Sequence, residues 1–152
     1  MESFVPKVIL LRHGERGDYV TPKIDSEIEF DPLLTENGRN QVKASSKFIK
    51  NLIHEDLAKL EIYSSPLIRC IQTSALFLNE IGMKDKPINI TNSLVENLIT
   101  LHFPFDPLNK CLLRTKDKGE ILEKYTLGFN FIDEKNEKFG FPETKEQVKA
   151  RF

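Results

Sequence analysis

The sequence is poor in several features, and each shortage excludes a class of protein. Among 152 residues there are only two cysteines, Cys70 and Cys111, and their spacing fits no metal-ligand pattern. No apolar run approaches the ~20 residues that a membrane-spanning helix needs. The formal net charge is −1, which gives no overall attraction to nucleic acid or to an anionic membrane. We therefore expect a reduced, cytoplasmic protein without a nucleic-acid or membrane partner, in which any anion site is a local cluster.

Length and composition predict a single globular domain. The chain is 39% hydrophobic and 30% charged, as is usual for soluble domains of this size. An acidic residue at position 2 and an early apolar run of only four residues argue against a signal peptide. No internal repeat or low-complexity tract is present, so we expect one domain over residues 1–152. The oligomeric state is not indicated.

Apolar patterning predicts alternating strands and helices. Val8–Leu11 is apolar on both faces and precedes a glycine turn, which is typical of a fully buried strand. Helix starts are signalled by capping residues and by proline in the first turn. The expected order is strand 8–11, loop 17–32, helix from Thr35, strand 61–63, helix from Ser65-Pro66 to Gly82, strand 88–95, loop 97–113, a short helix 117–125, and a last helix opened by Thr144 and Gln147. This alternation predicts an α/β fold around a parallel sheet.

The segment Arg12-His13-Gly14-Glu15-Arg16 follows the first predicted strand directly. In an open α/β sheet, ligands bind beyond the carboxyl ends of the strands. Guanidinium groups match phosphate oxygens, and a neutral imidazole can attack phosphorus. The pattern therefore favours a phosphate site with His13 as nucleophile. The alternative is a strand that ends in polar residues and binds nothing.

Two later residues are candidates for the same site. Arg69 lies in the first turn of the helix from Ser65-Pro66, where the helix dipole already favours an anion. Glu96 follows the third predicted strand and could protonate a departing alcohol oxygen. Either side chain could instead be a solvated surface residue, and Glu15 and Asp18 are weaker acid candidates. The other two histidines, His54 and His102, are interpreted as structural.

Four segments together resemble the histidine phosphatase superfamily, whose fold is that of the cofactor-dependent phosphoglycerate mutases. They are Leu11-Arg12-His13-Gly14-Glu15, Asp31-Pro32-Leu33-Leu34-Thr35-Glu36-Asn37-Gly38 with Gln41, Ser64 to Thr73, and Leu94-Val95-Glu96. The resemblance covers about residues 5–150 and implies a three-layer sandwich around a mostly parallel sheet. Within the superfamily, the start Arg12-His13-Gly14-Glu15-Arg16-Gly17-Asp18 is most similar to the Sts/TULA and ecdysteroid-phosphate phosphatase branch. The segment 129–133 and the helix start at Pro142-Glu143-Thr144 resemble that branch more loosely.

The resemblance also implies a role for each matching residue. His13 would be the nucleophile that becomes phosphohistidine, and Glu96 would be the general acid and then the base for water. Arg12, Arg16 and Arg69 would hold the phosphoryl oxygens. Because three guanidinium groups supply the neutralising charge, no metal or other cofactor is expected. The expected partner is a phosphorylated small molecule or a phosphoprotein.

The sequence departs from the family pattern in its C-terminal part. Family members have a later strand that ends in a second pocket histidine, usually within Ser-His-Gly, and no Ser-His-Gly occurs in these 152 residues. We therefore expect an N-terminal portion of the fold, incomplete at the C-terminus, in which the Val8–Leu11 strand has an uncovered edge.

Three functions remain open at this point. The first is a phosphomonoester hydrolase, weakened by the missing imidazole. The second is an inactive phosphate-binding or interaction module of the same fold. The third is a phosphoglycerate mutase, which is disfavoured because mutases have asparagine where this chain has Tyr19.

Overall fold

A computed structural model describes residues 8–22, 30–111, 124, 129–131 and 139–151. Its sheet has three parallel strands in the order β1-β2-β3. These are β1 (Ile62–Ser64), β2 (Ile88–Ile90) and β3 (Phe129–Phe131). The central strand is fully buried at both of its isoleucines, Ile88 and Ile90, as expected for a parallel strand covered on both sides. The predicted α/β fold around a parallel sheet is confirmed.

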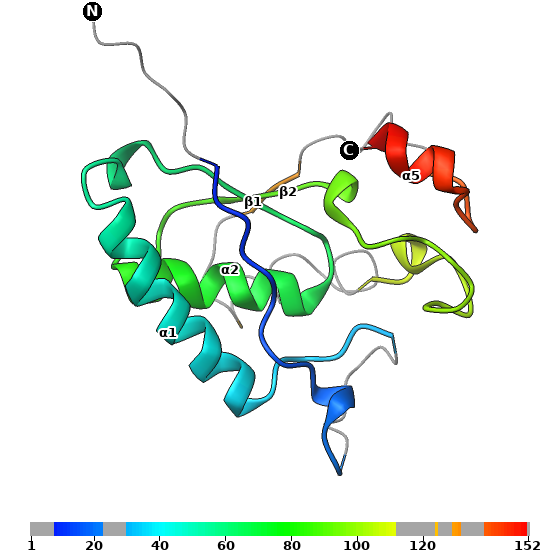
Figure 1. The fold of residues 1–152 in the computed structure, drawn as a ribbon, viewed down its shortest axis with the longest axis horizontal. Coiled ribbons are helices and arrows are strands. Elements are labelled where there is room, and N and C mark those ends of the chain that lie inside the picture. The colour runs from blue at the N-terminus through cyan, green and yellow to red at the C-terminus, as the bar shows by residue number, and fades with distance from the viewer. Residues whose placement is uncertain (1–7, 23–29, 112–123, 125–128, 132–138, 152) are drawn as a thin grey trace, which may run out of the picture.

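Two helices pack together and bury the apolar residues predicted to face the core. These are α1 (Glu36–Leu52) and α2 (Ile68–Ile81), and α2 also contacts β1 and β2. Figure 1 shows α1 crossing close to α2 below the strands. The contact residues Val42, Ile71 and Leu78 are each at most 2% exposed. The core of the described residues therefore lies between this helix pair and the sheet.

Three helix ends form where capping residues predict them. Thr35 caps α1 by accepting a hydrogen bond from the Gly38 N–H at 2.8 Å. Gly82 ends α2 with φ 84, a left-handed conformation that favours glycine. The last helix, α5 (Lys145–Arg151), begins with reciprocal bonds between Thr144 and Gln147 at 2.7 and 3.2 Å. The predicted capping box is thus confirmed.

Short 3-10 turns occupy the connections. They are η1 (Gly17–Tyr19), η2 (Leu57–Lys59), η3 (Asn92–Leu94) and η4 (Pro107–Asn109). Two of them lie inside the predicted loops 17–32 and 97–113. Across the described ranges, no helix is both long and apolar enough to cross a membrane.

The prediction of a buried strand at Val8–Leu11 is wrong. The segment has no strand pairing, and Val8 and Leu10 are 82% and 93% exposed. Figure 1 shows it as an extended trace running past the other elements. An apolar run is buried only when neighbours cover both of its faces, and the three described strands pair with one another instead.

The third predicted strand is shorter than expected, so Glu96 does not terminate it. β2 ends at Ile90, and the side chain of Thr91 accepts a hydrogen bond from the Ser93 N–H at 3.2 Å. Such local side-chain bonds compete with the strand ladder and turn the chain. Glu96 consequently follows η3 rather than a strand.

Two further differences involve contacts distant in sequence. α2 begins at Ile68 rather than at Ser65, because the carboxylate of Asp31 accepts the Ile68 N–H at 2.9 Å. β3 lies in a segment for which no strand was predicted, and its pairing with β2 defines it. The predicted helix 117–125 lies outside the described residues, apart from position 124.

Candidate active site

The loop formed by His13, Gly14 and Glu15, called the histidine loop below, packs its backbone closely against the beginning of α1. A Cβ atom added to Gly14 would lie 2.3 Å from the carbonyl oxygen of Gly38, so both glycines are needed for this approach. Glu15 reinforces the contact: its carboxylate accepts the Thr35 hydroxyl at 2.6 Å, and its N–H donates to Gln41 at 2.9 Å. Glu15 therefore has a structural task, although the sequence also allowed it as an acid.

His13 is half-buried, and its ring has a defined tautomer. Nδ1 lies 2.8 Å from the carbonyl oxygen of Gly14. A carbonyl oxygen can only accept, so Nδ1 carries the proton and the lone pair is on Nε2. Burial lowers the pKa of His13 below its ordinary value; the bond to Gly14 opposes this, and the charges of Arg69, Arg12 and Arg16 add to the lowering. The neutral, nucleophilic form is therefore favoured.

Arg69 is buried in the first turn of α2, with only 1% of its surface exposed. One Nη donates to Asp31 at 3.3 Å, and the other donates to Glu96. Its Nε is buried and has no hydrogen-bond partner among the described residues. A fixed guanidinium with a donor to spare suits an anion-binding role.

Arg16 is held from two sides at the start of η1. It donates to Asp18 through Nε at 3.0 Å and through Nη2 at 2.7 Å, and it stacks on the ring of Tyr19 at 4.9 Å. Burial alone would lower the pKa of Arg16, but Asp18 outweighs it, with help from Tyr19 and Glu96, so that the pKa is raised. The side chain therefore stays charged. Asp18, like Glu15, is occupied by a structural contact.

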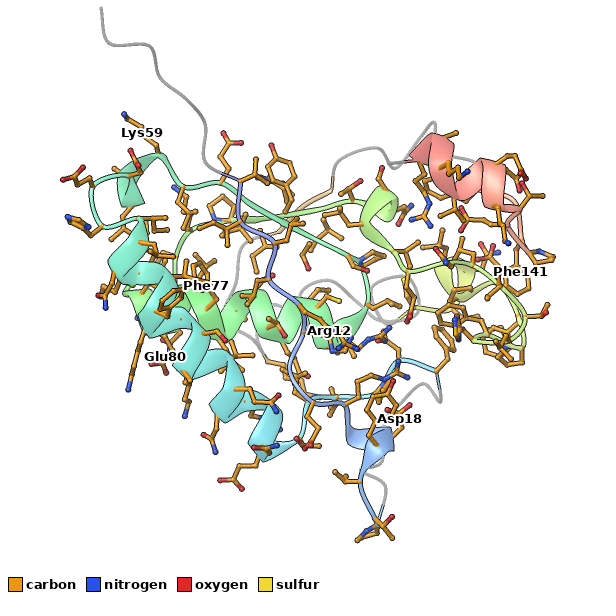
Figure 2. The ribbon with its side chains drawn as sticks, in the orientation of Figure 1. Arg12, Asp18, Lys59, Phe77, Glu80 and Phe141 are labelled. Atoms are coloured by element: carbon orange, nitrogen blue, oxygen red, sulfur yellow. The ribbon has the colours of Figure 1, made fainter. Side chains whose placement is uncertain are left out.

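Glu96 is the point at which two of the predicted arginines meet. Its carboxylate accepts from Arg69 and lies 4.0 Å from Nη1 of Arg16, and the side chain is 41% exposed. The structure thus brings Arg16, Arg69 and Glu96 into contact. Arg12 is exposed; its charge reaches His13, and Figure 2 draws its side chain in front of the N-terminal end of α2.

Asp31 belongs to this site and was missed as a functional candidate. Its side chain is fully buried and bridges Arg69 to the first N–H of α2. In the sequence it is the first residue of the family-like segment Asp31 to Gly38, to which no role was assigned. Its partners lie 37 and 38 residues away, so no local signal marks it.

The other two histidines lie where the sequence placed them. His54 is exposed after α1, with Nδ1 3.1 Å from the carbonyl oxygen of Asn51. His102 is exposed in the loop before η4. In the part of the chain that the structure describes, no group of three His, Cys, Asp or Glu residues could hold a metal ion.

Sequence comparisons identify the family of this chain. Residues 8–99, which include every predicted site residue, match the profile of the histidine phosphatase superfamily (branch 1). The chain is also similar to the Saccharomyces cerevisiae protein named phosphoglycerate mutase 3, with 34% identity over 93 residues. That match covers 57% of this chain and only 29% of the yeast protein. Because the family profile spans more than half of the sequence, the chain belongs to the histidine phosphatase superfamily.

Proposed function

We propose that this protein hydrolyses phosphomonoesters through a phosphohistidine formed on His13. The observation that supports the proposal best is the tautomer of that ring. Nδ1 carries the proton and donates it to the carbonyl oxygen of Gly14, which leaves the Nε2 lone pair available. Burial, and then the positive charges of Arg69, Arg12 and Arg16, lower the pKa of the ring and favour its neutral form. A neutral imidazole next to cations is the arrangement that attack on a phosphate dianion requires.

The first step transfers the phosphoryl group to the protein. Nε2 of His13 attacks phosphorus, and the bond from phosphorus to the ester oxygen breaks. Glu96, displaced from Arg69 by the substrate, takes up a proton from solvent, and the departing oxygen then takes that proton from it. Arg12, Arg16 and Arg69 hold the equatorial oxygens, and the unsatisfied Nε of Arg69 gains an oxygen acceptor.

The second step returns His13 to its starting state. Glu96 takes a proton from water as that water attacks phosphorus, and the bond from phosphorus to Nε2 breaks. The electron pair returns to the ring, and inorganic phosphate leaves. The arginines stabilise charge in both steps, so the chemistry requires no metal.

In the free protein the carboxylate of Glu96 lies against the guanidinium groups of Arg69 and Arg16, which are proposed to bind the phosphate. Arg69 donates to it, and Arg16 lies 4.0 Å away. A phosphate dianion offers these guanidinium groups more charge and more acceptors than one carboxylate does. We therefore expect the substrate to displace Glu96 from Arg69, toward the leaving group.

The substrate class is proposed from the motif at the site. The start Arg12-His13-Gly14-Glu15-Arg16-Gly17-Asp18 favours the Sts/TULA and ecdysteroid-phosphate phosphatase branch. A phosphorylated small molecule or a phosphoprotein is then the substrate. Cys70, in α2, is a thiol rather than half of a disulfide, which suits a reaction in the reducing cytoplasm.

The yeast relative favours a second candidate. Since that protein is named a phosphoglycerate mutase, the phosphoryl group on His13 could pass to a second phosphoglycerate instead of to water. Both candidates share the phosphohistidine and differ in its acceptor. Product analysis after incubation with a labelled phosphoglycerate separates them: free phosphate indicates hydrolysis, and label exchanged between positions indicates mutase activity.

A trapping experiment tests the shared step. The wild-type protein is mixed with ³²P-labelled p-nitrophenyl phosphate, quenched in alkali and digested, and the labelled peptide is identified. We expect the label on His13, and we expect His13→Ala to lose both the label and hydrolysis, by ~10³-fold or more. His54→Ala is the matched control and should retain both.

Two outcomes would contradict the proposal. Phosphate or vanadate binding without any label on the wild type would indicate a phosphate-binding module. Full hydrolysis by purified His13→Ala protein would assign the nucleophile to another residue.

A further inference from the structure

A buried ion pair far from His13 in sequence holds the segment that carries Glu96. Arg151, the last residue of α5, donates from Nε and Nη2 to the two carboxylate oxygens of Glu143, each at 3.0 Å. The side chains are 2% and 1% exposed. Arg151 also stacks on the ring of Phe139 at 5.3 Å. The guanidinium is thus fixed in one orientation.

The remaining donor of Arg151 reaches the backbone on the N-terminal side of Glu96. Nη1 donates to the carbonyl oxygen of Ser93 at 2.8 Å and to that of Val95 at 2.6 Å. Figure 1 shows α5 next to the chain that follows β2. Lysine has no planar fork, so it cannot hold a carboxylate with two parallel bonds and cap two carbonyl groups at once.

Glu143 holds the other side of the same segment. Its carboxylate accepts the Leu98 N–H at 2.9 Å, and its own N–H donates to the carbonyl oxygen of Leu98 at 2.7 Å. Val95 and Leu98 are at most 1% exposed. Glu96, between these anchors, is 41% exposed. The backbone is fixed on both sides of a carboxylate that is itself open to solvent.

We propose that the Glu143–Arg151 pair is a positioning device for Glu96. It touches neither His13 nor the arginines of the site in the described residues, so its effect on catalysis passes through the backbone of residues 93–98. A buried ion pair is weak support for stability alone, because desolvation offsets the attraction. Fixing a proton donor within hydrogen-bond reach of the leaving oxygen is a task for which a rigid anchor is effective.

The inference rests on the proposed function, because Glu96 matters as a general acid only if phosphoryl transfer occurs. A positioning role predicts a particular dependence on the leaving group. p-Nitrophenyl phosphate has a good leaving group and needs little proton donation, whereas an alkyl phosphate needs a donor. A residue that only stabilises the fold would affect both esters equally.

The experiment compares Arg151→Lys, Glu96→Gln and the double variant on both esters. We expect Arg151→Lys to lower kcat for the alkyl phosphate by ~10²-fold, within the usual range for general acid catalysis. Its kcat for p-nitrophenyl phosphate should change by less than about threefold, with KM nearly unchanged in both cases. In the Glu96→Gln background, Arg151→Lys should have no further effect on the alkyl ester.

Two additional variants guard against misfolding. Glu143→Gln keeps the size of the side chain and an oxygen for the Leu98 N–H but removes the charge that pairs with buried Arg151, so it tests the pair from its other side and should show the same leaving-group pattern. Lys149→Ala removes an exposed cation from the same helix and should change neither ester. Thermal unfolding of each variant identifies any that is not folded.

The outcomes separate this inference from the proposed function. Equal loss on both esters by folded Arg151→Lys and Glu143→Gln, or additive losses in the double variant, would overturn the positioning role alone. Failure of the wild type to hydrolyse either ester would overturn the proposed function and this inference with it.

Discussion

At the scale of single residues, the electrostatic state of His13 is the property on which the site depends. Its pKa is lowered chiefly by burial and further by three arginines. The neutral ring therefore persists to a lower pH than that of an ordinary histidine. Activity that requires neutral His13 should decline only as the pH falls through this lowered pKa.

NMR titration of the imidazole rings tests this prediction in the absence of substrate. His13 should titrate below the ordinary value for a histidine. Arg12→Gln removes one positive charge and should shift the pKa of His13 upward. An unchanged pKa of His13 in the Arg12→Gln variant would mean that the charge of Arg12 does not act on the ring.

Glu96 offers a second prediction at this scale, because it competes with phosphate for Arg69. Glu96→Gln removes a negative charge next to two guanidinium groups. We expect the variant to bind phosphate or vanadate more tightly, by about tenfold. It should at the same time hydrolyse esters with poor leaving groups more slowly. Calorimetric titration measures the affinity, and weaker binding by Glu96→Gln would show that the carboxylate does not compete.

Removing the guanidinium of Arg69 should have the opposite effect on phosphate affinity. Arg69→Ala removes a buried donor and should weaken phosphate binding by ~10- to 100-fold, the usual cost of a charge-assisted hydrogen bond. It also leaves the carboxylate of Asp31 buried without its cation, so thermal unfolding is measured alongside. Arg39→Ala is the control, because Arg39 is an exposed arginine at the start of α1. An unchanged phosphate affinity in folded Arg69→Ala would place this residue outside the pocket.

At the scale of elements, the contact between the histidine loop and α1 is made by two glycines. Gly14→Ala puts a Cβ atom 2.3 Å from the Gly38 carbonyl oxygen, and backbone cannot move aside as a flexible side chain can. We expect a loss of about 1–3 kcal/mol in the free energy of unfolding, the usual cost of overpacking, together with loss of hydrolysis.

Gly140→Ala is the matched control for that steric argument. There the added Cβ meets only the end of the Gln147 side chain, at 2.9 Å, and that end can shift at the cost of at most its capping bond to the Thr144 N–H. Denaturant unfolding should therefore show a change of less than about 1 kcal/mol, without loss of hydrolysis. If Gly14→Ala were as well tolerated as Gly140→Ala, the close packing of the loop on α1 would be wrong.

At the scale of the whole molecule, the buried apolar core contrasts with the exposed apolar segment at residues 8–11. Leu10 is 93% exposed, whereas Ile71 is fully buried between α2 and its neighbours. Leu10→Ser should change the free energy of unfolding by under about 0.5 kcal/mol. Ile71→Ala should lower it by about 2–5 kcal/mol, through lost burial and a residual cavity. Chemical denaturation measures both, and comparable losses would place Leu10 in the core.

The sequence determined those features that depend on neighbouring residues. Thr35 and Gly82 mark helix ends because capping and left-handed φ are local properties. The Thr144 and Gln147 box is equally local. The family followed from motifs whose residues are contiguous, and the profile match over residues 8–99 confirms it.

Only the tertiary structure decided the contacts between distant segments. Val8–Leu11 has the composition of a buried strand, yet burial depends on what packs against it, and that information is not in the segment. Asp31 bonds to Arg69 and to the first N–H of α2, and Glu143 and Arg151 bond to the backbone on both sides of Glu96. These hydrogen bonds join positions that are 37 to 58 residues apart. Helix caps form from what lies next along the chain, whereas the fixing of the segment that carries Glu96 depends on what lies next in space.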